Sequence, residues 1–234
     1  MNNTVVGNLD VAIVCVIAFV SFFPQLVAGP IERASHLLGQ FAEKRRFDLA
    51  RASDGCRQIL WGFTKKVVIA YRLAPVVSSV YSDPDAPVEA LVVATLFFAF
   101  QIYCDFSGYS DIALGTARLF GFELMQNFDT PYFSRNVSEF WKRWHISLST
   151  WFRDYVYIPW GGSRTSKPRQ LWNTFVTFTL SGLWHGANWT FVVWGGVNGL
   201  YQVLSLMTRR ARARLAEMIA VLHVLAEVAE PCAA

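Results

Sequence analysis

Uncharged apolar stretches long enough to cross a bilayer alternate with short charged segments along this chain. Val11–Ile31 and Gln170–Thr208 contain no Asp, Glu, Lys or Arg, and Val88–Cys104 is nearly free of charge. About 20 apolar residues at 1.5 Å each cross a hydrocarbon core of about 30 Å. The pattern therefore predicts an all-α, multi-pass transmembrane bundle, in which Pro24 and Pro30 kink or end the first span.

The segment Ile59–Tyr81 is apolar apart from a few basic residues, and it precedes a turn at Ser82–Pro87. Such a span is tolerated if its cations reach the headgroups or face a cavity. Farther along, Asp105 and Asp111 continue the span that begins at Val88. Two interpretations are open for these carboxylates: burial with pairing to basic groups, or a position at the interface in contact with water.

Two polar segments are expected at the membrane surface. Glu32–Arg57 has mixed charge and loosely helical apolar spacing, which suits an interfacial amphipathic helix or, alternatively, a cytoplasmic loop. Asn127–Arg169 is too polar to span but is rich in tryptophan, as is typical where protein meets headgroups. A helix there would place four side chains on one face, namely Trp141, Trp144, His145 and Leu148.

The last apolar run is interrupted at the sequence SGLWHGANW, Ser181–Trp189. Basic residues flank the run on both sides, so the positive-inside rule places both ends in the cytoplasm and the run must enter and return. Its first arm, Leu171–Trp184, reaches only about 21 Å. His185 is therefore expected within the membrane, where an interrupted helix is tolerated only beside a cavity or inside protein. We expect re-entrant and interfacial helices around a central tunnel.

Composition supports a membrane protein and excludes other classes. Hydrophobic residues make up 53% of the chain and aromatic residues 15%, more than a soluble core of this size normally uses. The net charge of +4 comes from cations clustered between apolar runs, not from one basic face, so no nucleic-acid partner is expected. The four cysteines lack CxxC spacing, so neither a metal site nor a disulfide framework is indicated.

His185 is the first candidate catalytic residue. It lies among Trp184, Gly186 and Asn188, so that indoles could shield the ring, glycine could allow a close approach and an amide could orient it. A dry pocket favours the neutral imidazole, which is the form that takes a proton from a hydroxyl. The alternative is a core histidine that bonds a neighbouring helix.

His145 is the second candidate, because it lies beside Trp144 in a basic, aromatic segment with Lys142, Arg143 and Arg153 nearby. It could be catalytic or orient the substrate, or it could be a surface histidine at the level of the headgroups. The neighbouring cations could bind lipid phosphates or a nucleotide-bearing donor such as coenzyme A. Motifs of metalloproteases, P-loop proteins and hydrolases are absent from the sequence.

Four long motifs in one order carry a family resemblance: FFPQLVAGPIER at Phe22–Arg33, QIYCDFSGYSDIALGTARLFGF at Gln101–Phe122, NFDTPYFSRNVSEFWKRWHISLSTWFRDYVYIPWGG at Asn127–Gly162, and SGLWHGANWTFVVWG at Ser181–Gly195. With them the chain resembles the membrane-bound O-acyltransferases. Within that family it is similar to the bacterial branch that includes the alginate O-acetylation membrane protein.

The resemblance implies a multi-pass enzyme of the inner membrane that moves acetyl groups from a cytoplasmic donor, acetyl-CoA or another acyl thioester, across the bilayer to an exported polysaccharide such as alginate. It implies His185 as the catalytic residue and His145 as the other functional position. We expect an extracytoplasmic acetyltransferase partner and no bound cofactor or metal. Further candidates for binding substrate or lining the tunnel are Trp184, Asn188, Trp144, Arg143 and Asp105.

The resemblance also predicts the domain organisation. Residues 1–208 are expected to form part of the family's domain, and residues 209–234 a basic and then amphipathic tail unlike the family. Two alternatives to catalysis remain at this point. One is a noncatalytic transporter or scaffold of a polysaccharide export complex, since broken helices also occur in transporters; the other is an inactive, truncated remnant.

Overall fold

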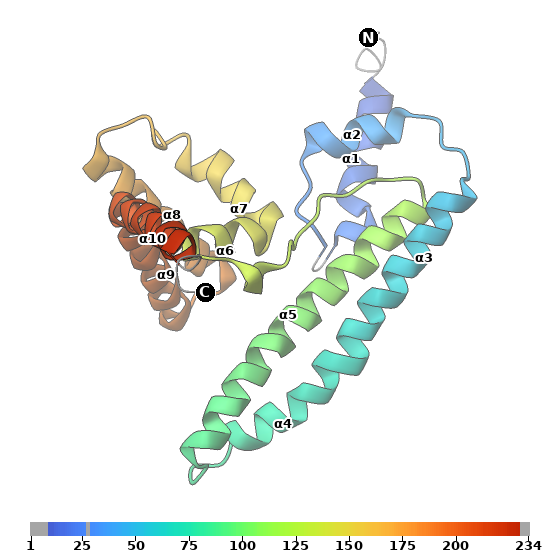
Figure 1. Cartoon of the computed structure of the whole chain (residues 1–234). Coiled ribbons are helices and arrows are strands. Elements are labelled where there is room, and N and C mark those ends of the chain that lie inside the picture. Colours follow the sequence, from blue (N-terminus) through green and yellow to red (C-terminus); the bar gives the residue numbers. More distant parts are fainter. Residues whose placement is uncertain (1–8, 27–28, 230–234) are drawn as a thin grey trace. The chain divides into compact units, whose positions relative to one another are not determined.

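The computed structural model describes residues 9–26 and 29–229, and every regular element in these ranges is helical (Figure 1). The chain divides into two compact units. The first contains Met1–Asp129 and Arg143–Leu148, and the second contains Thr130–Lys142 and Ser149–Ala234. The predicted all-α class is confirmed for the described residues.

The first helix is shorter than the apolar run that predicts it. Helix α1 covers Leu9–Ser21, and a single 3-10 turn, Phe23–Gln25, follows it. Its 13 residues extend about 20 Å, less than a hydrocarbon core. One uninterrupted helix over Val11–Ile31 is therefore not found, but the predicted interruption at Pro24 is confirmed: the helix stops at Ser21, just before the buried Pro24, which has no backbone N–H to continue it.

A short helix and an extended linker occupy the first polar segment. Helix α2 covers Ala34–Ala42, the linker follows, and Asp48 caps the next helix by accepting a hydrogen bond from the Arg51 amide. Leu37 of α2 is fully buried. The segment is thus neither one amphipathic helix nor a plain loop.

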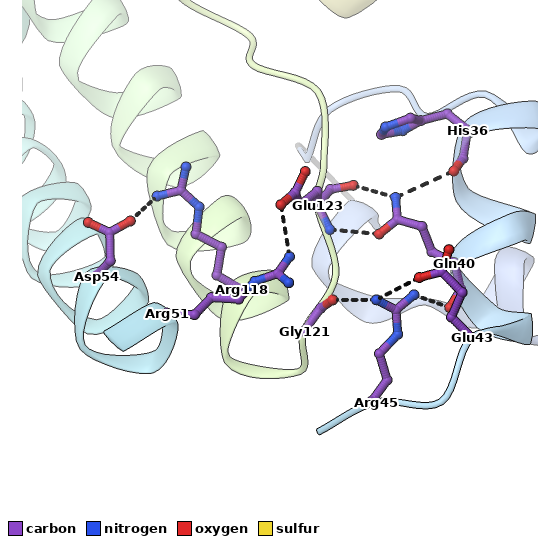
Figure 2. Close-up of polar contacts among 9 residues, drawn as sticks. All are labelled: His36, Gln40, Glu43, Arg45, Arg51, Asp54, Arg118, Gly121 and Glu123. Carbon is purple, nitrogen blue, oxygen red and sulfur yellow. Dashed lines mark hydrogen bonds and ion pairs between the residues drawn. The ribbon is translucent and has the colours of Figure 1, made fainter. Parts of the chain in front are cut away.

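Figure 2 shows the polar contacts that fix α2 against the segment after helix α5 (Val88–Leu119). Gln40 forms a pair of 2.9 Å hydrogen bonds with the backbone of Glu123, and the Arg45 guanidinium donates to the Gly121 carbonyl at 2.7 Å. The Glu123 carboxylate in turn accepts from Arg51 of helix α3 (Leu49–Phe63) at 3.1 Å. These contacts hold three segments distant in sequence at one end of the first unit.

The centre of the first unit is a pair of long antiparallel helical segments. One contains α3 (Leu49–Phe63), a π-helical stretch (Thr64–Ala70) and α4 (Tyr71–Tyr81), and the other is α5 (Val88–Leu119). Of the described helices, α5 alone is long and apolar enough to cross a membrane. That agrees with the span predicted to begin at Val88.

Glycines set how closely the two segments approach. A methyl group added at Gly62 would lie 2.5 Å from the Gly108 carbonyl oxygen, and one at Gly115 would lie 2.5 Å from the Gly55 carbonyl oxygen. Because the obstruction is backbone in both cases, no side chain could move to relieve it. Small residues that let backbones approach are typical of helix packing in membranes.

Lysines of the π-helical stretch pair with the carboxylates of α5. Lys66 lies 2.5 Å from Asp105, and Lys65 forms an ion pair with Asp111, which also accepts a hydrogen bond from Gln58 at 3.1 Å. Lys65 is only 8% exposed. Pairing with basic groups is therefore found for both carboxylates, but the Asp105 side chain is 48% exposed, so burial together with pairing holds only for Asp111.

The second unit is built around a helical hairpin. Helix α8 covers Lys167–His185 and α9 covers Trp189–Met207, and α10 (Arg209–Ala229) follows. The close approach depends on glycines: a methyl at Gly195 would lie 2.6 Å from the Phe178 carbonyl oxygen, and one at Gly199 would lie 2.9 Å from that of Phe175. The predicted entering and returning arms are therefore one tightly packed pair.

Candidate functional site

His185 is the last residue of α8, directly before the predicted helix break. Its ring lies 5.4 Å from Trp194 and 5.0 Å from Trp184, both edge to face, and is roughly parallel to Phe191 at 6.5 Å. No described side chain hydrogen-bonds its ring nitrogens, and the residue is exposed on this chain. Aromatic rings thus surround the imidazole on this chain, while its nitrogens have no hydrogen-bond partner among the described residues.

The residues after His185 turn the chain back into α9. A methyl at Gly186 would meet the Phe191 ring at 2.6 Å, so glycine is required for the ring to pack there. The side chain of Asn188 accepts from the Thr190 amide at 3.0 Å and so caps α9. The Asn188 side chain was expected to orient His185. In the structure it instead satisfies a backbone N–H group at the start of α9, as N-cap residues do.

His145 occupies a buried break between two short helices. Helix α6 covers Val137–Arg143 and α7 covers Ile146–Phe152, and His145 between them has a φ of 45° and is 7% exposed. The prediction of one continuous helical face from Trp141 to Leu148 is wrong for this reason. A left-handed residue ends one helix before the next begins.

A buried polar cluster fixes this break. The Asn127 side chain accepts from the Ser147 hydroxyl at 2.6 Å and donates to the Ser110 hydroxyl at 3.2 Å, while the backbone carbonyl of Asn127 accepts from the Ile146 amide at 2.9 Å. The Ser147 oxygen also accepts from the Ile31 amide at 2.9 Å. Three of the family-like motifs thus meet immediately beside His145.

Aromatic rings cover the other side of the break. The His145 ring lies edge to face on Phe106 at 4.7 Å, and Phe106 and Trp144 both contact Phe128, at 5.0 and 5.1 Å. Tyr103 adds a contact to Phe128 at 5.7 Å. His145 is thus a buried residue with a fixed backbone, not a histidine on a helix surface.

The remaining candidates are divided between the two units. Trp184 and Asn188 adjoin His185 in the second unit. Trp144 and Arg143 adjoin His145 in the first unit, where the Arg143 carbonyl accepts from the Asp129 amide at 2.9 Å. Asp105 lies on α5, five residues before Ser110 of the polar cluster, and it pairs with Lys66. Each histidine therefore has its own set of neighbours.

Sequence reasoning missed the residues that position both histidines. Asn127, Ser110 and Ser147 are uncharged polar residues inside quoted motifs, and nothing in their spacing shows that they meet. Phe191 and Trp194 lie three and six residues beyond the break within an apolar helix. A sequence signal existed only for the close approach of α3 and α5, where the glycines recur at a spacing of seven residues: Gly55 and Gly62 in α3, and Gly108 and Gly115 in α5.

Comparison with known proteins decides the family. The family model described as MBOAT, membrane-bound O-acyltransferase family, matches residues 9–220. The chain belongs to the membrane-bound O-acyltransferases. Members of this family are multi-pass membrane proteins, which agrees with the membrane architecture expected from the apolar runs, and the match covers both histidine-bearing breaks.

Several curated relatives of this membrane-bound O-acyltransferase are similar over most of its length. A probable alginate O-acetylase, AlgI, from Azotobacter vinelandii is 44% identical over 82% of this chain and 38% of its own. A peptidoglycan O-acetyltransferase from Helicobacter pylori is 37% identical over 86% and 40%. A teichoic acid D-alanyltransferase from Bacillus subtilis is 29% identical over 76% and 47%. The chain spans less than half the length of these relatives.

Proposed function

We propose that this membrane-bound O-acyltransferase transfers acetyl groups from a cytoplasmic thioester to hydroxyl groups of an exported polysaccharide such as alginate. The identity of 44% to a probable alginate O-acetylase supports this acceptor. The observation that carries the mechanism is His185 at the end of α8, framed by aromatic rings and with no hydrogen-bond partner for its ring nitrogens among the described residues.

In the proposed reaction, His185 acts as a general base. Its neutral ring nitrogen removes the proton of the acceptor hydroxyl while that oxygen attacks the thioester carbonyl carbon. The carbon–sulfur bond then breaks, and the imidazolium returns the proton to the leaving thiolate. The products are the O-acetyl ester and the free thiol, and the protein is unchanged.

His145 has a second role in this proposal. Its break, held by the polar cluster of Asn127, Ser110 and Ser147, gives the imidazole a fixed backbone position. Such preorganisation suits a group that orients a reactant or stabilises charge in the transition state. The proposal places the reaction in a tunnel of the inner membrane, with acetyl-CoA or another acyl thioester as donor and an extracytoplasmic acetyltransferase as partner.

Replacement of the proposed base tests this function. His185→Ala, at normal membrane abundance in the cell that makes the protein, should lower acetate incorporation into polymer by a factor of about 100 to 10,000, the usual contribution of a general base. His36→Gln is the matched control, because that histidine is half-exposed on α2 and glutamine keeps a hydrogen-bond donor for the buried Glu32. Unchanged incorporation in His185→Ala would exclude His185 as the base.

Donor consumption separates transfer from conduction. Purified protein in lipid nanodiscs should release free thiol from acetyl-CoA or another acyl thioester when polymer acceptor is present. A transporter or scaffold would not consume the thioester, so a lack of turnover by well-folded protein with each donor would favour the noncatalytic alternative.

A further inference from the structure

The second unit contains a basic pocket whose residues have no role in the proposed transfer. Its volume is about 800 Å³, and residues of α6, the end of α9 and the start of α10 line it. Four cations lie in its wall beside one carboxylate, Glu139; the cations are Arg135, Lys142, Arg209 and Arg212. The pocket therefore has the size of a small-molecule site and an excess of positive charge.

Hydrogen bonds between α6, α9 and α10 hold one guanidinium in place at this pocket. Gln202, only 6% exposed, donates to the Val137 carbonyl at 3.1 Å and accepts from the Ser138 hydroxyl at 2.7 Å, which in turn lies 3.2 Å from the Ser205 hydroxyl. Nη2 of Arg212 donates to the Ser205 carbonyl at 2.7 Å and to its hydroxyl at 2.9 Å. Because only Nη2 is used, the Nε and Nη1 donors of this guanidinium have no partner among the described residues.

The other pocket cations are poorly neutralised. Arg135 lies 3.4 Å from Glu139, but its side chain is 89% exposed, so the pair is weak. In the part of the chain that the structure describes, no carboxylate lies within ion-pair distance of Lys142, Arg209 or Arg212. Clustered cations repel one another, and a bound anion relieves this repulsion.

The charge excess and the kinds of donor favour a phosphate group over a carboxylate. A carboxylate carries one negative charge and two acceptor oxygens, whereas a phosphate ester carries a charge of about −1.5 to −2 at pH 7 and three acceptor oxygens. Guanidinium groups bind phosphate through two parallel hydrogen bonds, and ammonium groups bind it as point charges. Since three pocket cations lack an ion pair, the more highly charged anion gains more from this site.

The pocket is separate from the proposed catalytic base. Trp141 lines the pocket, and its ring lies 5.6 Å from that of Phe178 and 5.8 Å from that of Trp194. Trp194 in turn lies 5.4 Å from the His185 ring, and His185 is not among the residues that line the pocket. Binding in the pocket can therefore be measured without any acyl transfer.

We propose that the basic pocket binds a phosphate group, with Arg212, Lys142 and Arg209 as its main partners. The basic start of α10 places the pocket on the cytoplasmic side under the positive-inside rule. A soluble phosphate compound and the headgroup of a phospholipid offer the same chemistry there, and the experiment distinguishes these two sources.

Anion binding to the purified protein tests the proposal. Isothermal titration calorimetry in phosphatidylcholine nanodiscs at low ionic strength would measure the affinity for inorganic phosphate, with acetate as the carboxylate for comparison. Native mass spectrometry of protein from nanodiscs that contain phosphatidic acid would measure binding of the lipid phosphate.

The pocket variant is Lys142→Gln with Arg209→Gln. Neither side chain forms a hydrogen bond or an ion pair within the described residues, so the fold should be retained. The matched control is Arg210→Gln with Arg214→Gln, which removes the same charge from residues of α10 that do not line the pocket.

We expect the wild type and the control to bind phosphate more tightly than acetate. The pocket variant should lose about fivefold in affinity for each removed cation, or roughly 25-fold in all. A loss confined to inorganic phosphate supports a soluble ligand, and a loss confined to phosphatidic acid supports a lipid headgroup. Equal losses in both variants, acetate binding as tight as phosphate binding, or no binding of either phosphate compound by the folded wild type would overturn the proposal.

Discussion

At the scale of residues, two backbone breaks place the two candidate histidines. His145 adopts a left-handed conformation that only glycine, asparagine and aspartate commonly adopt, and His185 ends α8 at a glycine. The first break is held by hydrogen bonds of Asn127, and the second by packing of Gly186 against Phe191. The two histidines are therefore positioned by different kinds of interaction, and each can be perturbed separately.

Asn127→Ala should destabilise the fold around His145. The change leaves the buried hydroxyls of Ser147 and Ser110 without their amide partner, which costs about 1–3 kcal/mol for each unsatisfied group. Thermal unfolding in nanodiscs measures the loss. Asn198→Ala, which removes one hydrogen bond to the Trp194 carbonyl on α9, should change stability little; an equal effect of the two variants would contradict the importance of the cluster.

Gly186→Ala should reduce activity more than it reduces abundance. The added methyl must displace the Phe191 ring, which lies roughly parallel to His185, and a displacement of about 1 Å at a catalytic group can cost up to about 100-fold in rate. Acetate incorporation at matched membrane levels is the measurement. Gly39→Ala is the control, because nothing lies within 4 Å of its new methyl. Full activity of Gly186→Ala would show that the Phe191 packing is dispensable.

At the scale of elements, glycines and buried ion pairs together determine how the long helices pair. The glycines bring α3 and α5 into backbone contact, and this approach places Lys65 of the π-helical stretch against Asp111. A charged group in an apolar helix is stable only with its partner. Packing and charge therefore depend on each other in this helix pair.

Lys65→Met should destabilise the α3–α5 pair strongly, because it leaves the Asp111 carboxylate without its cation. Removal of one partner of a buried pair costs about 3–5 kcal/mol, whereas replacement of both by apolar residues is often neutral. Lys65→Met combined with Asp111→Leu should therefore recover most of the stability measured by thermal unfolding. Lys44→Met in the exposed linker is the control, and no recovery in the double variant would argue against the pair.

At the scale of the whole molecule, the chain passes repeatedly between its two compact units. His145 belongs to the first unit and His185 to the second. The α8–α9 hairpin has basic residues at both open ends, from Lys167 to Arg169 and from Arg209 to Arg214. Under the positive-inside rule both ends face the cytoplasm, and this topology is directly testable.

Single cysteines introduced at Ser166 and Thr208 should both lie on the cytoplasmic side. In a variant without native cysteines, a membrane-impermeant maleimide should label neither position in intact spheroplasts and both after permeabilisation. The physical reason is the cost of moving the flanking arginines and lysines across the membrane. Labelling of only one position from outside would show that the hairpin crosses the membrane instead of returning, and labelling of both would show that it enters from the opposite side.

The sequence determined the helical class, the span at α5, the break at His185 and the family, because apolar length, helix-breaking residues and long motifs are local properties of the chain. It left open whether Asp105 and Asp111 are paired, and it failed at the break before α7, whereas it did predict an interruption of the first helix at Pro24. Only the tertiary structure decided those points, together with the polar cluster of Asn127 and the aromatic rings around His185. Each depends on side chains from distant segments meeting, and no local pattern in a sequence records which partner a buried polar group will find.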